Sequence, residues 1–247
     1  MIELLGVGIP RPDGAGWLLH RVCMQLESRD LTIVVSRDPA ERLALLDAVA
    51  GRRRPEEGRV YVGRVPMTRE NGARLRARVG DADLALPVVE PRSVLWNALA
   101  ARRPGVRALL GFLRYPRRGE REAALAALEL VGLRDEARRA AGRLSREARV
   151  RLLIARELAR RPEHVVVREI DASLGPEEAG RVLATLARVA RTERVGVVAS
   201  VESWLLARAH AHAVVALAEG LLVFDGSPAA LTDQLIARRL GIELARP

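Results

Sequence analysis

The segment 36–46, SRDPAERLALL, lies where a phosphate-binding loop would be expected. It follows an apolar, β-branched run at residues 31–35, which predicts a buried strand, and it precedes a predicted helix that ends at Gly51. A phosphate loop uses glycines whose N–H groups face phosphate, followed by a lysine and a hydroxyl that binds Mg²⁺. This segment has no glycine and no lysine, and no hydroxyl follows Arg42. We therefore expect the frame of a phosphate loop without its usual ligands.

The composition narrows the classes of function. The chain has 247 residues and is 49% hydrophobic, which suits one α/β domain with smaller lobes. Its net charge is +10, and all 41 basic residues are arginines, so no side chain can act as a phosphate-loop lysine. The positive charge favours an anionic membrane surface or nucleic acid, but an aromatic content of 3% argues against a base-stacking surface.

A few other residues could carry chemistry. The single cysteine, Cys23, excludes an internal disulfide and indicates a reducing cytosol. His210 and His212 stand two residues apart at a predicted helix-to-strand junction without further ligands nearby, so we favour a structural or exposed role over a metal site. The N-terminus lacks a basic leader, and no long uncharged apolar run occurs, so neither a signal peptide nor a transmembrane helix is expected.

Strands and helices alternate along the predicted chain. Residues 1–30 predict short strands and turns, 58–67 a strand pair, and 84–160 mostly helices. Three more buried strands are expected in HVVVREI, RVGVVASV and AVVALAEGLLVFDG, with the helix EEAGRVLATLARVARTE between the first two. This alternation predicts a mostly parallel sheet wrapped by helices.

The order of these pieces resembles the ATP-binding subunits of ABC transporters over essentially the whole chain. The segments LLDAVAGRRRPEEGRVYVGRVPM, RVGDADLALPVVEPRSVLWNALAA and RLSREARVRLLIARELARRPEHVVVREIDASLGP carry the likeness, and RALLGFLRYP with REAALAALELVGL is most similar to the phosphonate-type importers. The resemblance implies an α/β P-loop NTPase (RecA-like) fold with a mostly parallel sheet, an antiparallel β subdomain and a helical subdomain. We expect a single domain, 1–247, in which 1–83 and 161–247 form the core with the β subdomain and 84–160 forms the helical subdomain.

The family's functional positions can be carried over residue by residue. The glycines, lysine and hydroxyl of its phosphate loop fall on Ser36, Pro39, Glu41, Arg42 and Leu43, and its loop glutamine falls on Leu84. Its signature LSGGQ falls on Leu144, Ser145, Arg146, Glu147 and Ala148. Its metal-site aspartate falls on Arg168, its switch histidine on Glu202, and its adenine-stacking aromatic near Arg11 or Pro12; the catalytic glutamate is retained as Glu169.

These replacements predict a loss of ATP chemistry. Pro39 has no N–H to give, Glu41 adds negative charge at a helix N-terminus, and Leu43 cannot bind Mg²⁺. We therefore expect a non-hydrolysing subunit that is not an enzyme, with Glu169 a relic paired to an arginine, no metal, and ATP and Mg²⁺ absent or weakly bound. An active ATP-binding subunit of a phosphonate-type importer is the first alternative, and an arginine-rich binder of nucleic acid or an anionic surface is the second.

The helical part predicts how such a subunit assembles. The apolar and aromatic side chains that we expect to dock a partner are Trp96, Leu109, Leu110, Phe112, Leu113 and Tyr115, and simple packing of the lobe is the competing interpretation. The expected partners are an ABC membrane subunit, a second ABC-type subunit or a larger enzyme complex. A homodimer is also possible, and nucleic acid is not an expected partner. The expected location is the cytoplasm, including the inner face of the membrane.

Arg168 gives a sharper expectation. It ends a buried strand, where a charge is costly unless it is paired and hydrogen-bonded. The acidic residues that the resemblance gathers around it are Asp38, Glu41, Glu169 and Glu202. We expect a salt bridge from Arg168 to at least one of these four, first of all to Glu202 or to an acid of the loop.

Overall fold

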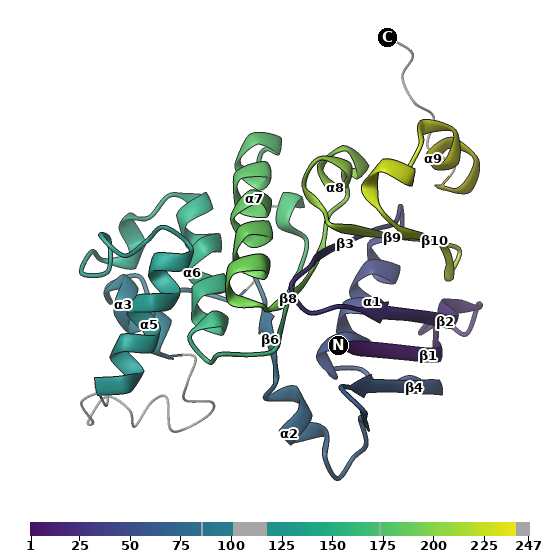
Figure 1. The fold of residues 1–247 in the computed structure, drawn as a ribbon, viewed down its shortest axis with the longest axis horizontal. Coiled ribbons are helices and arrows are strands. Elements are labelled where there is room, and N and C mark those ends of the chain that lie inside the picture. Colours follow the sequence, from purple (N-terminus) through teal and green to yellow (C-terminus); the bar gives the residue numbers. More distant parts are fainter. Residues whose placement is uncertain (85, 101–117, 173, 241–247) are drawn as a thin grey trace.

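The computed structural model describes residues 1–84, 86–100, 118–172 and 174–240, which form two sheets with helices between and around them (Figure 1). The strands are β1 Ile2–Pro10, β2 Trp17–Leu26, β3 Leu31–Val35, β4 Glu57–Val62, β5 Val65–Pro66, β6 Val79–Ala82, β7 His164–Val167, β8 Gly196–Ser200, β9 Ala213–Ala218 and β10 Leu221–Gly226. The helices are α1 Pro39–Ala50, α2 Gly72–Arg76, α3 Val94–Ala100, α5 Arg118–Leu130, α6 Arg146–Leu158, α7 Pro176–Glu193, α8 Trp204–His210 and α9 Asp233–Leu240, with the short 3₁₀ turns η2 Ala141–Arg143, η3 Ile170–Ala172 and η4 Pro228–Ala230.

The larger sheet has the strand order β10-β9-β3-β8-β7-β6, and only the edge pair β10–β9 is antiparallel. Both of its faces are covered, which explains the continuous apolar character of β3. Leu31, Ile33 and Val35 belong to one hydrophobic core, whereas Val34 belongs to the other. Successive side chains of a strand point to opposite faces, so each face of β3 packs into a core of its own.

The smaller sheet is antiparallel, with the order β2-β1-β4-β5. Helix α1 lies between the two sheets, because its apolar residues share a core with β1, β2 and the facing side of the larger sheet. Gly58 marks the closest approach of β4 to β1. It has a φ of +74°, and a Cβ there would lie 2.3 Å from the carbonyl oxygens of Leu5 and Gly6, so no larger residue fits.

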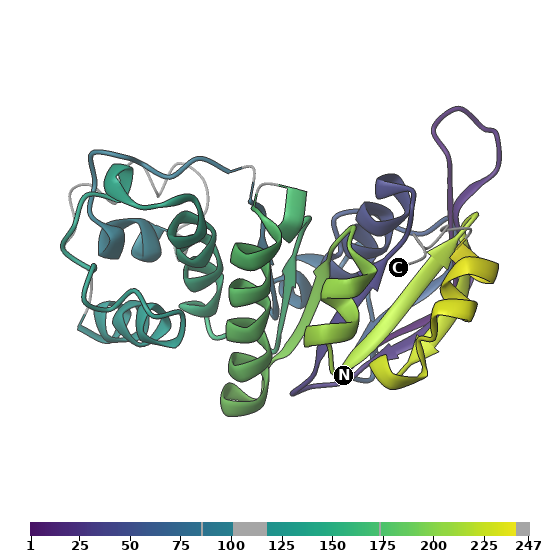
Figure 2. The same cartoon turned by 90° about the horizontal axis from the view of Figure 1, so that it is seen from above.

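Apart from α2, whose Leu75 shares the core of α1, the remaining helices cover the other face and one end of the molecule. Figures 1 and 2 show α3, α5 and α6 grouped at that end, with the long helix α7 beside them toward the strands. Helices α7 and α8 contact β3 and share its outer core. None of the helices in the described ranges combines the length and the apolar character that a bilayer crossing needs.

The expected strands and the mostly parallel sheet are confirmed, with two differences. The first 30 residues form two long strands of nine and ten residues rather than several short ones. Strand β6 was not expected, because VGDA is short and contains a glycine and an aspartate, both of which are rare in strands. The division into 1–83 with 161–247 and 84–160 stays a prediction.

Candidate functional site

Three neighbouring strands of the larger sheet bring polar residues to one edge. Ser36 follows β3, Ser200 ends β8, and Arg168 and Glu169 follow β7; the three strands are adjacent and parallel. In open α/β sheets, ligands bind outside the carboxyl ends of the strands. This edge, together with the start of α1, is therefore the candidate site.

Helix α1 begins at the site with its own internal cap. Asp38 is the N-cap, its side chain accepts a hydrogen bond from the Ala40 N–H at 2.8 Å, and Pro39 is the first helical residue. Arg11 donates to the same carboxylate at 2.7 Å. Burial opposes ionisation of Asp38, but these hydrogen bonds and the Arg11 charge outweigh it and lower its pKa. The positive end of the helix is thus already paired with a carboxylate.

Glu41 is turned inward. Its residue is 1% exposed, and its carboxylate accepts hydrogen bonds from the Ser36 Oγ at 2.6 Å and from the Gly220 N–H at 2.8 Å. Ser36 Oγ in turn accepts from the Asp38 N–H at 3.1 Å. The loop is therefore fixed by its own side chains and tied to the turn that joins β9 to β10.

Arg42 and Glu169 form a buried pair at this edge. The Arg42 Nε and Nη2 atoms donate to the two carboxylate oxygens of Glu169 at 3.0 and 2.8 Å, and Nη1 donates to the Ser36 carbonyl. The Arg42 residue is 2% exposed, and the Glu169 side chain is 23% exposed. This two-point contact is the strongest geometry for an arginine and a carboxylate. It confirms the expectation that Glu169 pairs with an arginine.

Glu169 is held by its backbone as well. Its φ is +46°, a left-handed conformation that is rare outside glycine, and its N–H donates to the Ser200 Oγ at 2.8 Å. The Ser200 hydroxyl donates back to Glu169 Oε1 at 2.9 Å. Burial opposes ionisation of this carboxyl, but the Arg42 and Ser200 hydrogen bonds outweigh it and lower the pKa of Glu169.

Arg168 is buried and paired, but not with any of the four expected acids. Its Nε and Nη2 atoms donate to the carboxylate of Asp81 at 3.0 and 3.1 Å, and its Nη1 lies 2.8 Å from the Asp47 Oδ1. Asp81 lies on β6, the strand beside β7, and Asp47 lies in the third turn of α1. The expected partners are wrong because the Arg168 side chain turns toward β6 and α1, whereas Glu169 turns toward Arg42.

The carboxylates around Arg168 are shared with a second arginine. Arg52 contacts Asp81 and lies 3.3 Å from Asp83. Burial opposes the charge of Arg168, but the hydrogen bonds and charge of Asp81, together with Asp47, outweigh it and raise its pKa. A cation thus stands where the resemblance puts a metal-binding aspartate.

The other carried-over positions surround the site at varying distance. Leu43 is half-buried on α1, and Leu84 packs against the outer core just after β6. Glu202 is exposed, and its N–H donates to Asp171 at 2.9 and 3.0 Å. Glu202 is therefore held through its backbone, by a carboxylate that the sequence analysis did not consider.

The signature positions lie on another element, at the start of α6. Ser145 is the N-cap of that helix and accepts from the Ala148 N–H at 3.2 Å. Arg146 is exposed, whereas Glu147 pairs with Arg151 and, at 2.8 Å, with Arg181 on α7. These residues do not meet the phosphate-loop positions within the described chain.

The predicted docking surface is described at one residue only. Trp96 is half-buried on α3, with the Arg92 guanidinium 5.6 Å from its ring centroid. The remaining five residues of that prediction lie outside the described residues: Leu109, Leu110, Phe112, Leu113 and Tyr115.

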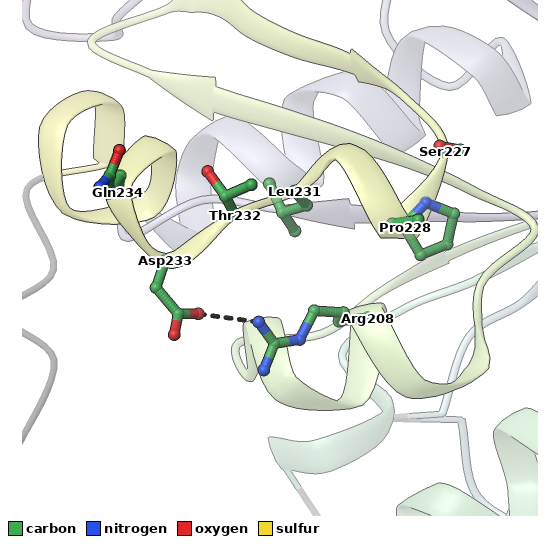
Figure 3. A pocket seen from close by; sticks show the side chains of 8 residues that line it. Arg208, Ser227, Pro228, Leu231, Thr232, Asp233 and Gln234 are labelled. Atoms are coloured by element: carbon green, nitrogen blue, oxygen red, sulfur yellow. Dashed lines mark hydrogen bonds and ion pairs between the residues drawn. The ribbon is translucent and has the colours of Figure 1, made fainter. Parts of the chain in front are cut away.

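The described chain has two further features that could form a site, a surface hollow beside α8 and the histidine His212. An open hollow of about 910 Å³ lies between α8, η4 and α9 (Figure 3), and the Arg208–Asp233 ion pair of 2.8 Å crosses it. His212 accepts a hydrogen bond from the Leu31 N–H at 2.9 Å, which confirms its structural role. Among the described residues, no group of three or more His, Cys, Asp or Glu side chains is placed to hold a metal ion.

Besides Asp171, three residues of the site were missed from the sequence. Ser200 could have been found, because it ends an apolar strand whose carboxyl end lies beside that of β7. Asp81 was hidden because β6 was not expected. Asp47 looked like an ordinary solvent-facing residue of α1, and its side chain is 32% exposed.

Comparison with known proteins places this geometry among ATP-binding proteins. No family model matches the sequence. The chain is 34% identical over 228 residues to a phosphonates import ATP-binding protein, PhnC 1, of Natronomonas pharaonis, covering 91% of this chain and 93% of the relative. It is 29% identical over 246 residues to PhnC of Rhizobium johnstonii, covering 98% and 87%. The solved structure of cbiO1 from Clostridium perfringens, part of the ABC transporter complex cbiONQ, superposes with a TM-score of 0.81 at 17% identity over 97% of this chain and 95% of that one.

These findings confirm the expected P-loop NTPase fold and correct the expected function. The relatives are named ATP-binding proteins, so the prediction of a non-hydrolysing structural or regulatory subunit that is not an enzyme is wrong, and the labels pseudo-ATPase and degenerate phosphate loop go with it. The error arose because the replacements at the family's functional positions were taken together as a loss of ATP chemistry. The fold still holds a buried cation, Arg42, against a strand-end carboxylate, Glu169, at the start of α1.

Proposed function

Because the chain belongs to the phosphonate-type ATP-binding subunits of ABC transporters, we propose that it binds and hydrolyses ATP as the nucleotide-binding subunit of a phosphonate importer. The observation that carries the proposal is the pair formed by Arg42 and Glu169 at the edge where three parallel strands end. This pair places a cation that can bind phosphate next to a carboxylate that can accept a proton from water.

Arg42 is the proposed phosphate contact. A guanidinium presents several N–H donors in a flat fork, which suits phosphate as well as carboxylate oxygens. Three of its nitrogens already donate, two to Glu169 and one to the Ser36 carbonyl. A guanidinium has five N–H groups, so these contacts use three of them, and the second N–H of Nη1 and of Nη2 can serve a bound phosphate while Glu169 stays paired.

Glu169 is the proposed general base. Its lowered pKa keeps it ionised at neutral pH, which a proton acceptor requires. Water attacks the γ-phosphorus, the bond from phosphorus to the β–γ bridging oxygen breaks, ADP leaves with that oxygen, and the proton of the water passes to the carboxylate. Ser200 positions the carboxylate by its two hydrogen bonds.

The proposed assembly places two copies of the chain on membrane subunits at the cytoplasmic face. The start of α6, with Ser145 and Arg146, is exposed and does not meet the loop at α1 within the described chain. A second copy is the simplest way to bring a signature segment to that loop, as the family resemblance implies. Arg146 then adds another guanidinium near the phosphates.

ATP turnover by the purified chain together with its membrane subunits tests the proposal. Glu169→Gln is expected to reduce turnover by about 100-fold or more, the usual range for loss of a general base, while ATP still binds. Arg42→Ala is expected to weaken ATP binding itself. Arg118→Ala is the matched control, because Arg118 pairs with a carboxylate on a helix surface and is 95% exposed. A wild-type assembly that neither binds nor hydrolyses ATP would contradict the proposal.

Docking on the membrane subunit is tested with a matched pair of tryptophans. Trp96 on α3 and Trp204 on α8 each lie under an arginine, at 5.6 and 4.7 Å from the ring centroid. Trp96→Ala is expected to weaken co-purification with the membrane subunit, whereas Trp204→Ala leaves it unchanged. Equal loss in both variants would contradict docking through α3.

A further inference from the structure

We propose that this nucleotide site works without a divalent cation, with Arg168 at the position of the metal-binding aspartate and Arg42 meeting the phosphates. The inference rests on the proposed function, since it concerns how the same site takes ATP. It keeps the expectation that Mg²⁺ is not part of the site and gives it a physical basis in the described residues.

The residues at the expected metal position do not fit Mg²⁺. This ion needs close to six oxygen ligands in octahedral geometry at about 2.0–2.1 Å. The positions that the resemblance assigns to its protein ligands are occupied by Leu43, Leu84 and Arg168. Two of these side chains have no oxygen to offer. The third is a guanidinium, which is always protonated and repels a cation.

Two of the carboxylates that remain nearby, Asp38 and Glu169, are already held by arginines, and Glu41 is held by Ser36 and Gly220. Asp38 accepts from Arg11 at 2.7 Å, and Glu169 accepts from Arg42 at two points. Entry of Mg²⁺ at either carboxylate would require an arginine to leave its partner. Mg²⁺ would also have to lose bound water, and the carboxylates that it would contact are already neutralised by arginines.

The Arg168 side chain is fixed in one position by burial and by its contacts. Its residue is 8% exposed, and all three of its nitrogens face carboxylate oxygens, two toward Asp81 and one toward Asp47. Arg52 braces Asp81 from the other side. A guanidinium that cannot leave thus stands at the sequence position of a residue that would bind an exchangeable Mg²⁺ ion.

This arrangement predicts which form of the nucleotide binds. In solution with magnesium, ATP carries the ion on its phosphates, and the ion would then lie near the guanidinium group of Arg42. Two like charges at short range in a partly buried site repel. Free ATP offers its full negative charge to Arg42, so we expect the metal-free nucleotide to bind at least as tightly as its magnesium complex.

Calorimetric titration of ATP into the wild-type chain, once with magnesium and once with EDTA, tests the proposal. The Kd of ATP measured in EDTA is expected to be equal to or lower than the Kd measured in magnesium. If the repulsion is weak, the two values should agree within about threefold. Binding that weakens by about tenfold or more in EDTA would overturn it. The two buffers are matched in ionic strength with NaCl to control for general salt effects.

Two outcomes separate this inference from the proposed function. Absence of ATP binding in both buffers would contradict the proposed function, and the metal position is then tested directly with Mn²⁺ and electron paramagnetic resonance on the nucleotide-free chain. We expect no bound Mn²⁺, and one tightly bound ion per chain would overturn the inference.

Substitution of Arg168 supplies the converse test. Arg168→Asp puts a third carboxylate beside Asp47 and Asp81 and creates the oxygen set that the wild-type chain lacks. Added Mg²⁺ is expected to raise the Tm of Arg168→Asp, and to leave the Tm of wild type and of Arg168→Gln unchanged. An equal rise in all three would overturn the inference, and the wild-type titrations decide the matter if Arg168→Asp fails to fold.

Discussion

Arg42 and Arg168 are both buried arginines at the same sheet edge, but they are held in different ways. Arg42 contacts one carboxylate and one carbonyl, and that carboxylate belongs to a side chain that is 23% exposed. Arg168 contacts two carboxylates that come from β6 and from the third turn of α1. Exchange of a partner is therefore feasible at Arg42, whereas Arg168 joins three elements of the frame.

The difference teaches how one residue type can serve ligand binding and architecture at neighbouring positions. Arg168 and Glu169 are adjacent in sequence, but their side chains turn to opposite partners because Glu169 has a left-handed backbone. The charges are thereby sorted into two networks, one around Arg42 and one around Arg168, that share no residue. Four substitutions test this sorting, in order of expected effect on the free energy of unfolding.

Arg168→Ala is expected to destabilise the chain most. It leaves Asp47 without a cation and Asp81 with Arg52 alone, and loss of one partner of a buried ion pair costs about 3–5 kcal/mol. Urea denaturation measures the change. Arg118→Ala, at an exposed pair, should change stability by less than about 0.5 kcal/mol. A loss at Arg168 as small as at this control would show that the frame does not depend on the pair.

Arg42→Ala is expected to cost less, about 2–3 kcal/mol, because the partly exposed Glu169 can be solvated and keeps its bond to Ser200. The same denaturation experiment compares the two arginines directly. The comparison would be broken if Arg42→Ala were more destabilising than Arg168→Ala.

Glu169→Gln tests the pair through its pH dependence. The folded-state pKa of Glu169 lies below its unfolded value, so the stabilisation is fully present above the unfolded pKa of about 4.3 and is lost as pH falls through the lower folded pKa. Wild type should exceed the variant by roughly 1–2 kcal/mol at neutral pH, and the gap should close in acid. A gap that stays constant down to the acid limit would contradict an ionised Glu169.

His164 has to be allowed for in that experiment. Burial lowers its pKa to about 4, so its own contribution is present above the unfolded value of about 6.5 and is lost as pH falls from there toward 4. Both proteins carry this residue. Its effect therefore cancels in the difference between wild type and Glu169→Gln.

Ser200→Ala is expected to have the smallest effect, about 1 kcal/mol for the lost hydrogen bonds to Glu169. A double-mutant cycle with Glu169→Gln separates the interaction from the loss of either side chain. Additive losses in that cycle would mean that Ser200 does not position the carboxylate.

Much of the frame could be predicted because its signals are local. The β-branched runs of β3 and β7 identify buried strands, and the turn at Gly51 ends α1 in a left-handed conformation, as expected. The pairing of Glu169 with an arginine followed from the cost of an unpaired charge in a partly buried site. These inferences need only the residue and its immediate neighbours in sequence.

The partners of Arg168 could not be predicted, because they depend on strand order. Asp81 reaches Arg168 only because β6 pairs with β7, with Ala82 opposite Val167. The sequence VGDA does not predict a strand. The function was misjudged for a related reason. The cationic role of a lysine position was discounted when an arginine stood there, although burial of Arg42 against Glu169 keeps a positive charge at the start of α1.

The bridge from Asp47 through Arg168 to Asp81 also has a mechanical consequence. It fastens the third turn of the helix that starts at the nucleotide site to the outermost strand of the sheet, and that strand leads through Leu84 toward α3. A displacement of α1 along its axis therefore has to break or reorient the contacts of Arg168 with Asp47 and Asp81. These contacts couple the position of α1 to that of β6.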